Sequence, residues 1–430
     1  MYKETTEELL AFIEGSPSVF HVVDNVRESL LKKGFTQLSE KEPFSLKEGK
    51  DYFIIRNASS LIAFRMPRKV DMKNAKGFHM VATHSDSPTF KVKHNPEMVA
   101  EGKYVRINTE KYGGMILSTW LDRPLSVAGR VVVEKDGAVA EKLVNVERDL
   151  FVIPNVAIHM NRDMNKGVEY NPQVDMIPLF GMTEEEDKGN GFVDIVAQSA
   201  DVKTEDILDY DLFLYVREKG RIWGANEEFV LSPKLDDLQC VYAQMKAFAD
   251  TQPNEHISVA AVFDNEEVGS GTMQGADSTF LSDVLKRICL AADVPEERYM
   301  EMVANSMLIS ADNAHAVHPN HPEKADPTNR PYINGGPVIK YHGSQKYTTD
   351  AVSGAFLKKL CKKAQVPYQT YYNRSDIAGG STLGNISTAH VSVASVDIGL
   401  PQLAMHSAVE MGGVKDTLYA IKVLTAFFGE

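Results

Sequence analysis

Residues 77–88 read GFHMVATHSDSP, an apolar run that ends in several polar side chains and a proline. Short apolar runs bounded by glycine and proline are typical of buried strands. Three further runs share this character: ISVAAVFD at 257–264, SMLISAD at 306–312 and HVSVASVDIG at 390–399. Helix-like stretches such as LDDLQCVYAQMKAFAD at 235–250 alternate with them. Strands separated by helices predict an α/β fold with a helix-sandwiched, mixed and largely parallel sheet.

The middle of the chain has a different sequence pattern. Its short β-type runs are broken by turns, among them KYVRINT, GRVVVEKDGAVAEKLVNV and DLFVIP. Strands at this spacing favour a small β barrel or sandwich. The 430 residues also exceed what one hydrophobic core usually supports. We therefore predict an α/β domain formed by residues 1–90 and 226–430, interrupted by an inserted β-rich domain at 91–225.

Composition and charge exclude several classes of protein. No run of 18 or more apolar residues is present, which argues against a membrane-spanning helix. The net charge of −13, from 59 dispersed acids against 46 bases, argues against a nucleic-acid partner. The N-terminal MYKETTEELLAFIEG is amphipathic and indicates a helix of the fold, not a signal peptide. The three cysteines, Cys240, Cys289 and Cys361, are scattered, which argues against a disulfide framework and favours a reducing cytoplasm.

Residues suited to metal binding recur just beyond the predicted strands. Such residues are His84 and Asp86, Glu266 and Glu267, Asp312, and His406 a short loop after its strand. Asp236 differs because it precedes a helix. Ligand sites in open α/β sheets gather outside the carboxyl ends of the strands, so we expect these side chains to converge.

Two imidazoles and three carboxylates suffice for a pair of divalent ions if one carboxylate bridges them. This donor set suits zinc, with cobalt or manganese as substitutes. In the adjacent pair Glu266-Glu267, one acid can coordinate while the other acts as a base. Asp86 can orient the imidazole of His84. Each residue alone also has an ordinary interpretation: Asp236 and Asp312 can cap a helix or a turn, and His406 can be a core histidine.

Several longer motifs resemble those of the aspartyl aminopeptidases, the peptidase family M18. In chain order they read ATHSDSP, IPNVAIHMNR, SPKLDDL, FDNEEVGS, SADNAHAVHPN, GGPVIKYHGSQKY, GGSTLGNI and LAMHSAVE, and the similarity covers nearly the whole chain. The resemblance implies a zinc-exopeptidase-like fold with two zinc ions per subunit, bridged by Asp236. It assigns the remaining metal ligands to His84, Glu267, Asp312 and His406, the general base to Glu266, and the support of His84 to Asp86.

The resemblance also implies an assembly role for the inserted domain and a tetrahedral homododecamer. His159 matches a family histidine that reaches the active site of a neighbouring subunit. The expected substrates are short peptides with N-terminal Asp or Glu, with Lys340 and His315 as candidate substrate-binding residues. The chain departs from the family pattern at His342, Ile377 and Ala378. A broader aminopeptidase or related amidohydrolase that accepts neutral residues, and a catalytically idle assembly or peptide-binding protein, are the alternatives.

Overall fold

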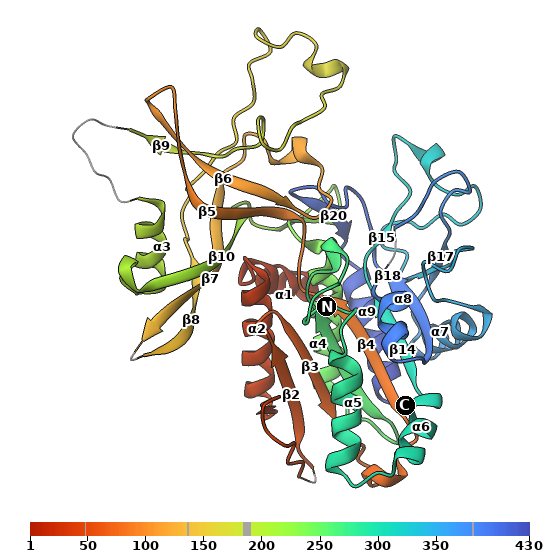
Figure 1. Cartoon of the computed structure of the whole chain (residues 1–430). Helices are drawn as coiled ribbons and strands as arrows, with labels where there is room; N and C mark the ends of the chain where they lie inside the picture. The colour runs from red at the N-terminus through yellow and green to blue at the C-terminus, as the bar shows by residue number, and fades with distance from the viewer. Residues whose placement is uncertain (48, 136, 184–190, 381) are drawn as a thin grey trace.

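The computed structural model describes residues 1–47, 49–135, 137–183, 191–380 and 382–430 (Figure 1). A nine-stranded sheet forms the centre of its larger part. In spatial order the strands are β1 (Thr36–Leu38), β2 (Asp51–Arg56), β3 (Ser60–Arg65), β13 (Ile257–Phe263), β4 (Phe78–His84), β14 (Met307–Ala311), β18 (Ala394–Gly399), β16 (Val338–Lys340) and β17 (Gln369–Tyr371). The central strands β13, β4, β14 and β18 run parallel, whereas the β2/β3, β3/β13 and β16/β18 pairs are antiparallel. The predicted mixed, largely parallel sheet is thereby confirmed.

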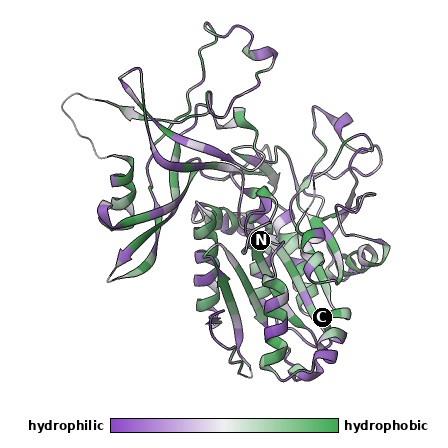
Figure 2. Ribbon diagram, viewed as in Figure 1, coloured by the Kyte–Doolittle hydropathy of each residue, from purple (hydrophilic) through white to green (hydrophobic). Residues whose placement is uncertain are grey.

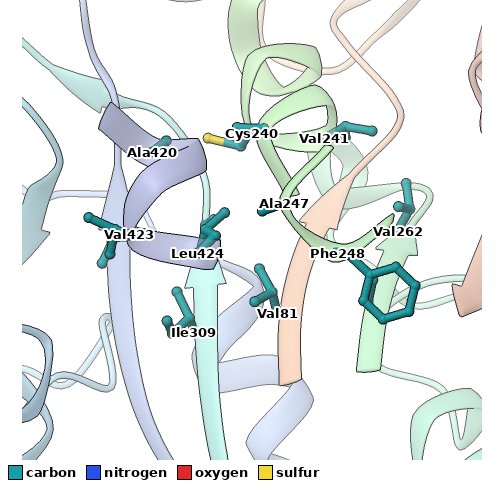
Figure 3. Close-up of a cluster of buried hydrophobic side chains, with 14 of the residues drawn as sticks. Val81, Cys240, Val241, Ala247, Phe248, Val262, Ile309, Ala420, Val423 and Leu424 are labelled. Carbon is teal, nitrogen blue, oxygen red and sulfur yellow. The ribbon is translucent and has the colours of Figure 1, made fainter. Parts of the chain in front are cut away.

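Helices cover both faces of this sheet (Figure 1). One face packs against α1 (Tyr2–Glu14), α2 (Val19–Lys32), α4 (Leu235–Asp250), α7 (Ala351–Ala364) and α9 (Asp416–Phe428). The other face packs against α5 (Phe280–Ala291), α6 (Glu296–Ala304) and α8 (Leu383–His390). Successive strand residues point to opposite faces, so Val81 joins the first core and its neighbours Met80 and Ala82 join the second. Figure 3 shows Val81 and Ile309 beneath Val423 and Leu424 of α9.

A second sheet is antiparallel throughout and lies between Thr89 and Val216 in the chain. Its strands, in spatial order, are β8 (Ala138–Asn145), β7 (Leu125–Lys135), β10 (Ile207–Val216), β5 (Thr89–Ala100), β6 (Tyr104–Tyr112) and β9 (Leu179–Met182). Residues 151–153 bridge the two sides of this sheet, because Phe151 pairs with Leu125 of β7 and Val152 pairs with Leu179 of β9. The helix α3 (Phe192–Ala200) adds Phe192 and Val196 to the core of the sheet. Figure 2 shows apolar residues on the strands and helices of both parts.

Two smaller sheets are formed by residues outside the two large sheets. β11 (Arg221–Trp223), β12 (Phe229–Ser232) and β20 (Glu410–Gly413) form a three-stranded sheet, and β15 (Ala314–His315) pairs with β19 (Pro401–Gln402). Within the described residues, no helix combines the length and apolar character needed to cross a membrane.

Candidate metal centre and substrate cavity

Several of the side chains suited to metal binding lie just beyond the carboxyl ends of the strands, as predicted. His84 is the last residue of β4, and the 3₁₀ turn Glu266–Val268 follows β13 after two residues. Asp312 comes directly after β14. Because β13, β4 and β14 run parallel, their carboxyl ends meet at one edge of the sheet.

Two further segments reach this edge from outside the strands. Asp236 lies in the first turn of α4, where its own backbone dihedral angles and those of Asp237 are not helical. His406 lies in the loop between β19 and β20 and has a left-handed φ of 66°. Such a conformation is uncommon for residues other than glycine and is found where surrounding contacts enforce it.

Together these residues form a compact group of potential metal ligands, called the ligand group below. Within it, ligand atoms of three sets lie within 4.8 Å of one another: His84 with Asp236, Asp237 and Asp312; His84 with Glu266 and Glu267; and Asp236 with Glu267 and His406. The structure thus brings together all five predicted ligands and the predicted base. It adds Asp237, the neighbour of Asp236 in the chain.

The two imidazoles present the same nitrogen to the carboxylates. Nδ1 of His84 lies 3.1 Å from the backbone carbonyl of Asp86, and Nδ1 of His406 lies 2.6 Å from the carbonyl of Gly114. A carbonyl can only accept, so each Nδ1 carries a hydrogen and Nε2 is the nitrogen left for a metal ion. Both Nε2 atoms face Asp236, so each can bind a metal ion that Asp236 also binds.

The separations between these atoms suit shared ions better than hydrogen bonds. The Nε2 atoms of His84 and His406 each lie 3.6 Å from a different oxygen of Asp236, and Nε2 of His406 lies 3.3 Å from Oε1 of Glu267. Two atoms bound to one zinc ion at 2.0–2.2 Å are roughly 3.4 Å apart in tetrahedral geometry. Among the described residues, Oδ1 of Asp236 and Oε1 of Glu267 are buried without a hydrogen-bond partner. The residues present therefore fit a zinc site.

Electrostatics agree with this interpretation. Burial raises the pKa of Glu266 to about 8 and that of Glu267 to about 7, and it also raises the pKa of Asp312. Burial has the same tendency at Asp236, but the two imidazoles hold its pKa well below the usual value. Several carboxylates thus compete for one buried space, and divalent cations would relieve their mutual repulsion.

Asp86 supports the ligand group in two ways. Its backbone carbonyl orients His84, while its carboxylate accepts hydrogen bonds from the backbone N–H groups of Glu266 at 3.1 Å and Glu267 at 3.2 Å. The Asp86 side chain itself lies 3.4 Å from Nδ1 of His84. The residue therefore fixes both the imidazole and the loop that carries the two glutamates.

Glu410 does the same for the other half of the group, and sequence reasoning missed it. Its Oε2 accepts a hydrogen bond from the backbone N–H of Asp236 at 2.9 Å, and its Oε1 accepts one from the N–H of His406 at 2.7 Å. The side chain is buried, and burial raises its pKa to about 8. The only signal in the sequence is its place at the end of the motif LAMHSAVE.

The segment that contains the antiparallel sheet also contributes to the site. Besides the Gly114 carbonyl, it supplies the backbone N–H of Ile116, which donates to the carbonyl of His406 at 2.9 Å. The hydroxyl of Tyr112, the last residue of β6, donates to the Asp86 carboxylate at 2.7 Å. The ligand group thus depends on contacts from both sheets.

A cavity of about 300 Å³ opens beside the ligand group and is called the substrate cavity below. Its lining includes Glu266, Asp236, Asp312, His315, Lys340, Tyr347, Tyr371, Thr382, Met405 and His406. Lys340 is buried, donates to the carbonyl of Asn313 at 2.8 Å, and lies 3.6 Å from Oδ2 of Asp312. Burial opposes its charge, but Asp312 raises the pKa of Lys340 above its usual value. The cavity therefore contains a fixed cation.

His159 lies apart from the groups described above. It is exposed in the loop 154–178, which extends from the antiparallel sheet (Figure 1). Its neighbours in this loop include the exposed apolar residues Val156, Ile158 and Met160. Among the described residues, His159 is not a member of the ligand group or of the cavity lining.

Comparisons with known proteins agree with this geometry. The model of a family described as Aminopeptidase I zinc metalloprotease (M18) matches residues 12–428. The chain is 48% identical over 428 residues to the probable M18 family aminopeptidase 2 of Clostridium acetobutylicum, covering 99% of this chain and 98% of the relative. A chain in the cryo-EM structure of the Ape4 and Nbr1 complex matches with a TM-score of 0.95 and 37% identity, over 99% of this chain and 86% of that chain. The S. cerevisiae mApe1 dodecamer matches with a TM-score of 0.86 and 28% identity, over 99% and 97% of the two chains.

Proposed function

This chain belongs to the M18 family of zinc metallo-aminopeptidases, and on this premise we propose that it removes N-terminal residues, preferentially Asp or Glu, from short peptides. The observation that carries the proposed preference is the buried cation of Lys340, which lines the same cavity as the ligand group. An ammonium group has three donors, and Lys340 uses one of them on the carbonyl of Asn313. A substrate carboxylate that enters the cavity can accept another, with His315 beside it.

Two zinc ions per subunit account for the composition of the ligand group. Asp236 would bridge them, because its two oxygens face different imidazoles. Asp312 lies with His84, and Glu267 with His406, which suggests how the other ligands divide. When bound, zinc polarises the scissile carbonyl and increases the acidity of water. Cobalt and manganese accept the same donor types.

Glu266 is the proposed general base. Its side chain lines the substrate cavity, whereas the adjacent Glu267 is directed toward His406 and does not contribute to the cavity lining. A general base must reach both the attacking water and the leaving amine, and an acid that faces the substrate cavity can reach both. Glu266 would take the proton from water and deliver it to the amine nitrogen, while Asp86 holds its backbone in place.

A broader specificity is the second candidate, and one contact favours it. Lys340 already lies 3.6 Å from Asp312, so a substrate carboxylate would share its cation with a metal ligand. Tyr347, Tyr371 and Met405 add apolar surface to the cavity. These walls would accept a neutral side chain, because apolar contacts need no charged partner.

Self-assembly into a dodecamer is also proposed. The related mApe1 structure is a dodecamer, and the exposed apolar residues of the loop 154–178 need a covering surface. In such an assembly His159 would approach a neighbouring subunit's site. The three cysteines are buried free thiols, which suits the proposed cytoplasmic location.

The test is turnover of zinc-loaded protein on chromogenic amides with different N-terminal residues. Wild type should prefer Asp and Glu, and Lys340→Ala should reduce kcat/KM for these two by roughly tenfold to a hundredfold, the effect of one charged hydrogen bond. Lys359→Ala, at an exposed position of α7, is the matched control. An unchanged acidic preference in Lys340→Ala would refute the assignment of Lys340, and a wild-type preference for Leu would support the broader specificity.

A further inference from the structure

Asp397 is a fully buried carboxylate outside the ligand group. It lies on β18, and among the described residues no Lys or Arg forms an ion pair with it. Its partners are instead hydroxyl and amide donors. Oδ2 accepts hydrogen bonds from the backbone N–H of Thr348 at 2.6 Å and from its hydroxyl at 2.7 Å, and Oδ1 accepts one from the hydroxyl of Thr382. One side chain thus holds two segments that are far apart in sequence.

Both segments form walls of the substrate cavity. Thr348 directly follows Tyr347, which lines the cavity and whose ring centroid lies 5.5 Å from Nζ of Lys340. Thr382 lines the cavity itself and precedes α8. The Thr349 hydroxyl also accepts a hydrogen bond from the backbone N–H of Asp397 at 2.9 Å. The spacing between these walls is therefore set by contacts to a strand of the central sheet.

The local packing leaves little freedom at this point. A Cβ atom added to Gly384 would come within 2.7 Å of Oδ1 of Asp397, so the first turn of α8 can approach the carboxylate only because this residue is glycine. The acceptor oxygens of Asp397 are thus closely packed between the two walls.

We propose that Asp397 is a positioning residue that sets the width of the substrate cavity by joining the Tyr347–Thr349 segment to Thr382. It acts on substrate affinity and side-chain discrimination through these walls and does not touch the reacting atoms. The inference deepens the proposed function and rests on it, because it assigns the cavity to the substrate side chain.

The test compares Asp397→Ala and Asp397→Asn in zinc-loaded protein. Alanine removes all three acceptor contacts, whereas asparagine keeps an oxygen for Thr348 and can donate its amide hydrogen to the hydroxyl of Thr382. Asp397→Ala should raise KM by about tenfold with a smaller change in kcat, and it should narrow the differences in kcat/KM between substrates. The KM of Asp397→Asn should stay within about threefold of the wild-type value. Zinc content by elemental analysis should remain at the wild-type level in both variants.

Val396→Ala is the matched control, since it removes buried volume from the same strand without touching the contacts of Asp397. A KM and substrate profile for Asp397→Ala equal to those of Val396→Ala would overturn the inference. If Asp397→Ala does not fold, Thr348→Val and Thr348→Ser decide, because the Thr348 hydroxyl donates to Asp397 and Thr348 is not among the lining residues of the cavity. A raised KM only in the valine variant supports the inference, and equal values refute it. If wild type shows no preference for acidic N-terminal residues, only the proposed specificity is contradicted. The inference about Asp397 concerns the KM of a variant relative to that of wild type and is judged separately.

Discussion

Replacement of Glu410 by glutamine tests whether the backbone of the ligand group is held as described. Glutamate offers an acceptor oxygen to each of two N–H groups, those of Asp236 at 2.9 Å and His406 at 2.7 Å. Glutamine offers only one oxygen, so its NH₂ group must face one of these donors. Measured above pH 8, where the Glu410 carboxylate is ionised, the variant therefore loses at least one hydrogen bond to a charged acceptor while its side-chain volume stays nearly the same.

The magnitude follows from that loss. A hydrogen bond to a charged group contributes about 1.5–3 kcal/mol. A loss of about 2 kcal/mol in ligand placement corresponds to roughly a 30-fold weaker affinity for zinc. This value lies within the roughly 10–100-fold effects seen when groups that orient metal ligands are removed.

The assay is zinc binding to metal-free protein, measured by competition with a chromogenic chelator. Glu297→Gln, an exposed glutamate in the first turn of α6, is the control and should bind zinc like wild type. Circular dichroism should show folded protein in each case. A folded Glu410→Gln protein with zinc affinity within about twofold of wild type would refute the reasoning, because twofold is only about 0.4 kcal/mol.

Two further predictions concern catalysis and acid stability. Glu266→Gln should lower kcat by about 10²–10⁴-fold, the usual contribution of a general base, with zinc content unchanged by elemental analysis; retained turnover would exclude Glu266 from that role. Burial lowers the pKa of His79 from 6.5 to about 3, so between these values the unfolded chain binds more protons and stability falls as pH falls below about 6.5. His79→Phe removes this dependence. Between about pH 7 and about pH 5, the free energy of unfolding of wild type should fall by about 2 kcal/mol relative to that of the variant, as measured by urea titration. A constant difference would contradict this account of His79.

The fold and the convergence of the site residues could be predicted because both depend on local pattern. Apolar runs at β4, β13 and β14 end in polar residues, and parallel strands bring those ends together. The family resemblance, now confirmed, supplied the roles predicted for the ligands, including the bridging role of Asp236, which follows no strand. The domain boundaries at residues 90 and 225 and the individual catalytic roles stay predictions.

The supporting contacts could not be predicted because they join residues that are distant in the chain. Nothing near His406 indicates that its acceptor is the carbonyl of Gly114. In the sequence, Glu410 and Asp397 cannot be distinguished from any other acid at the end of a motif or within a strand. Only the tertiary structure reveals the N–H and hydroxyl groups from which they accept hydrogen bonds. Backbone donors and acceptors carry no signature in the sequence, since every residue has them.

The hydrogen bond between His406 and Gly114 has a consequence for how the chain becomes active. Gly114 follows β6, so the carbonyl that fixes the metal-binding tautomer of His406 comes from the segment that contains the antiparallel sheet. A fully oriented set of metal ligands therefore requires the antiparallel sheet to lie in place beside the nine-stranded one. For the same reason the enzyme is not modular: a shortened chain without the antiparallel sheet would keep all five predicted ligands and lose the partner that orients one of them.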